Sequence, residues 1–228
     1  IYVTAWSSGY YFQLYEMIKT KSGDGFSIDY QILSLIGDAS SFVNNAHLSF
    51  TSPNFYTILN FVYSVQALTL AMIIFALTLY YPRSANKFQP SVLLIIGIFG
   101  TMAGMYYTIG VMHLRVPMSD FYLFIGLGQD WVLIVKYLYQ IVLNADRKST
   151  EGFAVEGVIG DVVGALSVLL ESAIHFSENG AASVNVPLML NATFSILMDI
   201  VLLYQHYYLY ADRRDVYAKV EAIEDAQT

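Results

Sequence analysis

The chain has 228 residues, of which 56% are hydrophobic and only 13% are charged. A soluble domain carries about twice that charged fraction, so the composition indicates a protein embedded in a membrane. The net charge of −7 argues against nucleic acid as a partner, and the absence of cysteine excludes disulfides and thiolate chemistry. The chain begins in an apolar run without methionine, Ile1-Tyr2-Val3, so we expect a further N-terminal segment to precede it.

Seven apolar stretches come close to the ~20 residues that a transmembrane helix needs. They are expected at residues 1–18, 28–50, 57–81, 90–112, 121–143, 153–174 and 189–210. The second is the least apolar because it contains Asp38, Asn44, Asn45 and His47. It can cross a membrane only if these groups face protein or water. The sequence therefore predicts an all-α transmembrane protein with seven helices.

The basic residues between the spans lie almost entirely on one side. One set of loops and the C-terminal tail contain Lys19, Lys21, Arg83, Lys87, Arg147, Lys148, Arg213, Arg214 and Lys219. The alternate loops contain only Arg115. Because cytosolic segments carry the excess of lysine and arginine, we expect the tail to be cytosolic. An odd number of spans then places the N-terminus on the other, lumenal side.

An internal repeat occurs at an offset of 127 residues. The matching pairs are Tyr10/Tyr137, Gln13/Gln140, Lys21/Lys148, Ser22/Ser149, Gly25/Gly152, Phe26/Phe153, Gly37/Gly164 and Ser40/Ser167. The repeat predicts two parallel three-helix units, residues 1–81 and 121–210, joined by a linker helix region at 82–120 and followed by a tail at 211–228. Parallel repeats occur in transporters, whose substrate site lies near the midplane between the halves. A duplicated scaffold with no passage would show the same repeat.

Two ionisable residues lie deep in the fifth and sixth spans, on either side of the charged turn 144–152. By helical rise, Lys136 lies roughly 10 Å and Asp161 roughly 12 Å from this turn, well inside a hydrocarbon core of ~30 Å. Such groups normally face a bundle interior and mark a pathway for ions or solute. The alternative is a Lys136–Asp161 ion pair, or a hydrogen bond to Tyr137, that only holds helices together. Asp199, in the last span, is either a second relay acid or a structural acceptor.

Two segments carry a family resemblance. Residues 136–140 (K-Y-L-Y-Q) and 147–153 (R-K-S-T-E-G-F), followed by Asp161, resemble the second PQ-loop motif of the cystinosin family of lysosomal, proton-coupled cystine transporters. Residues 5–13 and 21–29 resemble the first motif, and residues 194–210 are similar to the family's last helix. The resemblance implies the 3+1+3 helix arrangement of PQ-loop and SWEET-like proteins.

The resemblance also implies a set of site residues. It places the proton-coupling group at Asp161 and a second acid at Asp199. For substrate it indicates Trp6, Gln13, Lys136 and Gln140, with Tyr137 supplying aromatic surface beside them. It implies no catalytic residue, no metal and no cofactor.

The chain departs from the family pattern at five positions. Phe12 and Tyr139 stand where each motif has its proline, a residue that kinks helices and so provides a plausible hinge for alternating access. Gly157, Asn60 and Leu188 replace an expected asparagine, acid and lysine. An amino-acid substrate needs paired charges in its site, so these losses weaken the expectation of cystine itself.

Two main functions are consistent with these residues. The first is a proton-coupled symporter in a lysosomal or vacuolar membrane that moves a small polar solute, cystine or another amino acid, from lumen to cytosol. The alternative is a non-transporting structural or scaffolding subunit of a membrane complex, which the lost prolines and charges favour. A sugar carrier of the related seven-helix class ranks lower, because intramembrane acids suit proton coupling better. The expected partners are membrane lipids, the solute and protons, with protein partners binding through the cytosolic tail and no nucleic acid.

Overall fold

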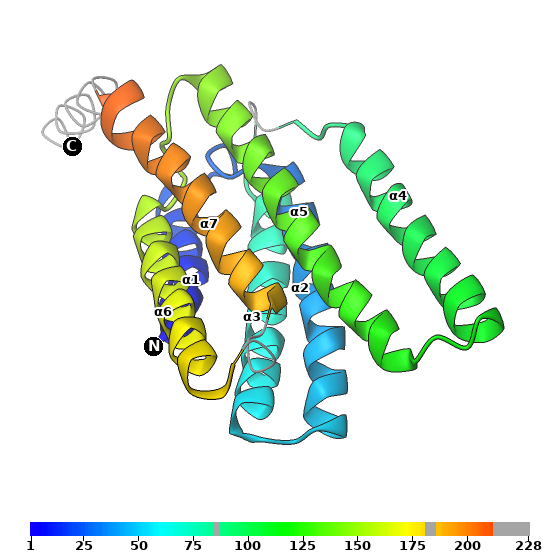
Figure 1. Ribbon diagram of the computed structural model, residues 1–228. Coiled ribbons are helices and arrows are strands. Elements are labelled where there is room, and N and C mark those ends of the chain that lie inside the picture. The colour runs from blue at the N-terminus through cyan, green and yellow to red at the C-terminus, as the bar shows by residue number, and fades with distance from the viewer. Residues whose placement is uncertain (84–86, 181–185, 212–228) are drawn as a thin grey trace, which may run out of the picture.

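The computed structural model describes residues 1–83, 87–180 and 186–211, and these form seven helices connected by short loops (Figure 1). The helices are α1 (Tyr2–Thr20), α2 (Ile28–Thr51), α3 (Phe55–Tyr80), α4 (Ser91–Met105, continued by the π-helix η1, Tyr106–His113), α5 (Met118–Arg147), α6 (Val155–Asn179) and α7 (Val186–Tyr204, continued by the π-helix η3, Gln205–Leu209). The predicted seven-helix, all-α fold is confirmed. The predicted tail lies outside the described residues apart from its first residue.

Five of these helices are long and apolar enough to cross a membrane: α3, α4 with η1, α5, α6 and α7 with η3. Helices α1 and α2 are less apolar because they carry polar side chains, several of which are buried. On α2 the buried polar side chains include Asp29, Gln31, Ser34 and Asp38. Of the four polar residues that made the second span a weak candidate, Asp38 is buried, Asn44 and Asn45 line the internal cavity described below, and the His47 ring stacks on Tyr122.

The helix contacts follow the internal repeat. α1 packs against α3 and α6, and its repeat equivalent α5 packs against α7 and α2. In the same way α2 packs against α3, and α6 packs against α7. The first helix of each predicted unit thus lies beside the second helix of the other unit. The exact bounds of the two units, 1–81 and 121–210, stay a prediction.

Helix α4 lies at the side of the bundle, next to α5 and apart from α1, α6 and α7 (Figure 1). Val92 is its only buried residue. This helix is apolar on all sides, and most of its side chains have no protein neighbour to cover them. Such a helix is typical of a span that faces lipid. This position agrees with a linker helix between two three-helix units.

The two loops of the repeat have the same local structure. Helix α1 ends at Lys21 with φ 49°, and α5 ends at Lys148 with φ 51°, both in the left-handed region that often ends a helix. The Ser22 hydroxyl then accepts from Asp24 N at 3.2 Å, and the Ser149 hydroxyl accepts from Glu151 N at 3.1 Å. The predicted repeat is therefore reproduced at the level of single hydrogen bonds.

Three glycines bring α6 close to α1. A Cβ at Gly157 would lie 2.9 Å from the Cα of Gly9, and Cβ atoms at Gly160 and Gly164 would overlap with Ser8 and Trp6. Small residues that let helix backbones approach are the usual interface in membranes. These three glycines therefore act in helix packing.

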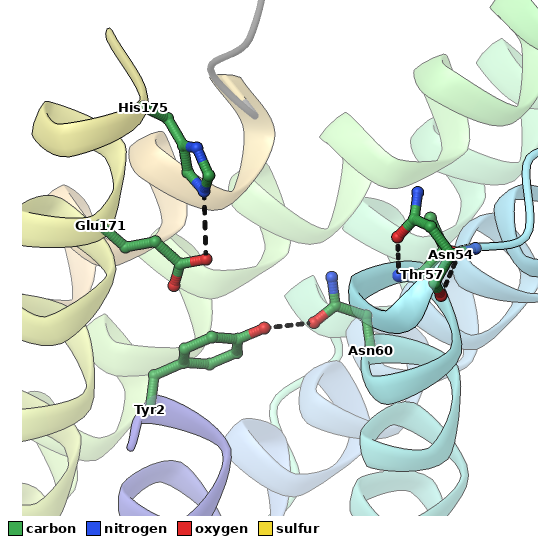
Figure 2. Close-up of polar contacts among 6 residues, drawn as sticks. All are labelled: Tyr2, Asn54, Thr57, Asn60, Glu171 and His175. Carbon is green, nitrogen blue, oxygen red and sulfur yellow. Dashed lines mark hydrogen bonds and ion pairs between the residues drawn. The ribbon is translucent and has the colours of Figure 1, made fainter. Parts of the chain in front are cut away.

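Several polar contacts lie at the end of the bundle that includes the start of α3 (Figure 2). The Asn54 side chain accepts from Thr57 N at 3.0 Å, and the Thr57 hydroxyl accepts from Asn54 N at 2.9 Å, which forms a capping box for α3. The Tyr2 hydroxyl donates to Asn60 at 2.6 Å, joining α1 to α3. On α6, His175 lies 3.7 Å from Glu171.

Candidate functional site: a polar cavity between the helices

A cavity of about 180 Å³ lies at the centre of the bundle, lined by residues from every helix except α4. Four ionisable side chains of the spans line it: Asp38, Asp130, Lys136 and Asp161. Ionisable residues in spans normally face such a cavity rather than lipid. The cavity is therefore where the chain's intramembrane charges meet.

Two aspartates are linked by hydroxyl groups in one wall of this cavity. The Tyr137 hydroxyl donates to Asp161 Oδ2 at 2.6 Å. The Ser195 hydroxyl lies 3.1 Å from Asp161 Oδ2 and 3.3 Å from Asp199 Oδ2. Asp199 is fully buried, and its Oδ1 has no hydrogen-bond partner among the described residues. A serine hydroxyl both donates and accepts, so it can pass a proton between the two acids.

Lys136 lies next to this acid pair but does not form a direct ion pair with it. Its Nζ lies 4.9 Å from the centre of the Tyr30 ring and 5.7 Å from that of Tyr137. Among the described residues, no carboxylate oxygen is within 4.0 Å of Nζ. Cation–π contacts therefore hold the ammonium in the cavity. Of the alternatives for Asp161, the structure has the Tyr137 hydrogen bond and not the Lys136 ion pair.

A second tyrosine–aspartate pair lies across the cavity. The Tyr10 hydroxyl contacts both carboxylate oxygens of Asp38, at 3.1 and 3.0 Å. Tyr10 is the repeat equivalent of Tyr137, so each unit places one tyrosine hydroxyl on one aspartate. The sequence reasoning counted Asp38 only as an interruption of the second span. Asp38 lies deep in its span, as Asp161 does, and the same argument from depth would have identified it as a candidate site residue.

Trp6 also lines the cavity. Its ring packs against Tyr2, with centroids 5.6 Å apart, and against Tyr63, with centroids 6.1 Å apart. The Nε1 atom is buried without a hydrogen-bond partner among the described residues. Buried indole donors usually have a partner, but this Nε1 lies against Gly164 of α6, where a Cβ would be 2.7 Å from it.

The two motif glutamines are bonded to protein instead. Gln140 is fully buried; its Nε2 donates to Gly25 O at 3.0 Å and its Oε1 accepts from Ser27 N at 2.9 Å. Gln13 lines the cavity, but its amide makes the corresponding bonds to the other loop. The amides of Gln13 and Gln140 thus anchor the loops, and a contact of either residue with substrate stays a prediction.

Two equivalent phenylalanines pack together where the loops reach the cavity. Phe26 and Phe153 both line it, and their ring centroids lie 5.8 Å apart. Directly beside them the backbones of Gly25 and Gly152 meet, so closely that a Cβ on Gly25 would overlap with Gly152. This end of the cavity is thus formed by both repeats together.

These features define a class: a multi-pass membrane protein in which two similar helical units enclose a polar, charged cavity. The model of the PQ loop repeat matches residues 1–54. The chain is 27% identical to a cystinosin homolog of Caenorhabditis briggsae, over 92% of the chain and 56% of that protein. It is 24% identical to cystinosin of Drosophila melanogaster, over 94% and 58%, and 26% identical to cystinosin of Bos taurus, over 92% and 61%. These matches support a protein of the cystinosin/PQ-loop family.

The chain spans little more than half the length of the curated relatives named here. Within the cavity it also differs from what the resemblance implies. Asn60, Gly157 and Leu188, the three positions that depart from the family pattern in polarity, all line the cavity. The departures from the pattern that the resemblance implies thus lie together at the cavity.

Proposed function

We propose that the chain is a proton-coupled transporter that moves a small polar solute, cystine or another amino acid, from lumen to cytosol. The observation that carries this proposal is the hydrogen-bonded chain Tyr137–Asp161–Ser195–Asp199 in the wall of the cavity. A scaffold does not need a buried acid pair, which is costly to keep in a membrane. A proton carrier needs an acid that reaches the same space as the solute.

Asp161 is the proposed proton carrier. An ionised carboxylate is costly to move through a closed, dry state, and binding a proton removes that charge. Tyr137 and Ser195 orient the carboxylate, and Ser195 links it to Asp199 as a second acid. Lys136, held beside them by two tyrosine rings, balances the charge when the proton leaves. Proton and solute would in this way occupy one cavity and move together.

The proposed solute contacts are Trp6, Lys136 and Tyr137, which line the cavity. The Lys136 ammonium is a donor that suits a carboxylate. The Tyr137 hydroxyl is already bonded to Asp161, so this residue offers its ring. We leave Gln13 and Gln140 out of the set because their amides anchor loops.

We place the protein in a lysosomal or vacuolar membrane, with the N-terminus lumenal and the C-terminus cytosolic. The distribution of basic residues supports the orientation. The matches to cystinosins support the compartment. An acidic lumen would supply the protons that drive export.

Proteoliposomes containing the purified chain test the proposal. We expect uptake of L-cystine, or of another member of a panel of amino acids, to rise when the outside is made acidic. Asp161→Asn should remove the acid stimulation while the protein keeps its melting temperature. Asp120→Asn is the matched control, since Asp120 is an exposed acid in the first turn of α5. Full acid stimulation in the Asp161 variant would overturn the assignment of the carrier.

One observation favours the alternative of a non-transporting scaffold. Helices α1 and α5 run without interruption through Phe12 and Tyr139, the positions where the motif prolines are missing. Helices without these prolines lack a ready hinge for alternating access. If no solute of the panel is taken up at any pH gradient, the scaffold is the better description. Introducing proline at both positions would then test whether a hinge restores uptake.

A further inference from the structure

Asp130 is a buried acid of the cavity that the proposed proton pathway does not use. Its side chain is 6% exposed and lines the cavity from α5. It lies six residues before Lys136, so the two are separated by roughly 9 Å along the helix axis. Neither Tyr137 nor Ser195 contacts it. Asp130 thus forms a separate polar region of the same cavity.

Within the part of the chain that the structure describes, Asp130 uses only part of its hydrogen-bonding capacity. The side chain lies beside Asn191 of α7, and its Oδ2 is buried without a hydrogen-bond partner among the described residues. Leaving a buried carboxylate oxygen unpaired costs free energy. Such an orphan in a native structure calls for an explanation, and a bound donor is the simplest one.

The side chains around Asp130 are amides, which carry an acceptor oxygen as well as donors and no positive charge. Asn191 and Asn44 both line the cavity. Asn44 lies against α5 one turn before Asp130, since a Cβ at Gly126 would be 2.9 Å from its Nδ2. The one basic residue in the lining, Lys136, is held by Tyr30 and Tyr137. A compact ammonium group, with three donors and one charge, matches this set of oxygens.

We propose that Asp130, Asn191 and Asn44 form a cation subsite that binds a protonated primary amine of the solute. Three carboxylates and one ammonium line the cavity, which favours a solute with net positive charge. A basic amino acid or a diamine fits this description better than an anion does. The subsite rests on the proposed function only in that the amine belongs to the transported solute; binding itself requires no transport.

Equilibrium binding to the purified full chain in detergent at neutral pH tests the subsite. The probes are L-lysine, 1,5-diaminopentane and L-cystine, with glutarate as an anion of similar length, measured by thermal shift and calorimetry. We expect the amines to bind and to raise the melting temperature, L-lysine and 1,5-diaminopentane more than L-cystine, with no effect of glutarate. Asp130→Asn should weaken amine binding about tenfold or more, as expected when a charge-assisted hydrogen bond is lost. Asn191→Ala keeps the carboxylate and should weaken binding less, and Asp120→Asn should bind like the wild type.

The outcomes separate the subsite from the proposed function. Amine binding that is unchanged in a folded Asp130→Asn protein overturns the subsite, whatever the transport assay shows. So does the failure of every amine to bind the wild type, or equal binding of glutarate. If Asp130→Asn does not fold, Asn191→Ala decides, since binding unchanged in that variant overturns the subsite. If amine binding depends on Asp130 but no proton-driven uptake is found, the proposed subsite is supported and the proposed transport function is overturned.

Discussion

Gln13 and Gln140 make the same pair of hydrogen bonds, each to the loop of the other repeat. Gln13 Nε2 donates to Gly152 O at 3.0 Å and its Oε1 accepts from Ala154 N at 2.9 Å. Gln140 does the same with Gly25 and Ser27, at 3.0 and 2.9 Å. The glutamines and their partners are related by one offset of 127 residues. A pseudo-twofold axis therefore runs between the loops, and the glutamine of each motif holds the two halves together.

The first prediction concerns the stability of this reciprocal contact. Gln140→Ala would leave buried backbone groups of Gly25 and Ser27 unpaired, together with the Asn144 amide oxygen that Gln140 also contacts. Each unpaired buried group costs about 1–3 kcal/mol, so unfolding free energy should fall by at least that amount. Gln66→Ala is the control, because Gln66 makes only an exposed bond to Tyr11. Scanning fluorimetry should rank Gln140→Ala well below Gln66→Ala; equal melting temperatures would contradict the anchoring role.

The second prediction concerns the glycines between the two loops. Gly152 has φ 78° and its Cβ would lie 2.9 Å from the Cα of Gly25, whereas Gly180 has φ 76° and no atom within 4 Å of a Cβ. An alanine at either site is strained by the positive φ, and Gly180, with ψ −177°, lies in a region that is essentially restricted to glycine. Only Gly152→Ala also pushes the repeats apart. We expect a clearly larger loss of melting temperature at Gly152 than at Gly180. Similar losses would mean that the loops have room to separate.

The third prediction compares the two tyrosine–aspartate pairs. Tyr137→Phe removes the 2.6 Å hydrogen bond to Asp161, and Tyr10→Phe removes the equivalent bonds to Asp38. Because only Asp161 is linked to Asp199, the pH dependence of solute uptake should change in Tyr137→Phe and stay that of the wild type in Tyr10→Phe. Uptake across a series of pH gradients measures this. If both variants have the same pH profile, Tyr137 has no role in the proton pathway.

The fold was accessible from the sequence because hydropathy reports span length directly. The second span shows the limit: Asp38 and the asparagines made it a weak candidate, yet it is a helix, Ile28–Thr51, with Asp38 buried. The offset of 127 residues also identified Gln13 and Gln140 as equivalent residues, and in the structure they make equivalent hydrogen bonds. A repeat in the sequence shows which residues are equivalent. When two equivalent units pack together, a contact made by a residue of one unit is made again by its equivalent in the other unit.

The site was only partly accessible. Asp161 was found because its depth in a span is unusual, and the same argument applied to Asp38 and Asp130 would have found both. The glutamines were placed with the substrate because the family resemblance implied it. Sequence alone does not reveal that their partners are backbone groups of a loop more than 100 positions away.

The last prediction concerns orientation, which the distribution of basic residues gives and the fold does not. The chain has no cysteine, so single cysteines introduced at exposed positions can report sidedness without background. Asp146→Cys, in the last turn of α5, and Ser52→Cys, just after α2, are exposed and leave every lysine and arginine in place. If the loops rich in lysine and arginine are cytosolic, an impermeant maleimide added to intact organelles should label Asp146→Cys and not Ser52→Cys. After permeabilisation both should be labelled, which shows that each thiol is reactive. Labelling of Ser52→Cys alone in intact organelles would show that the orientation is the opposite of the one predicted. An acidic lumen would then meet the other end of the cavity.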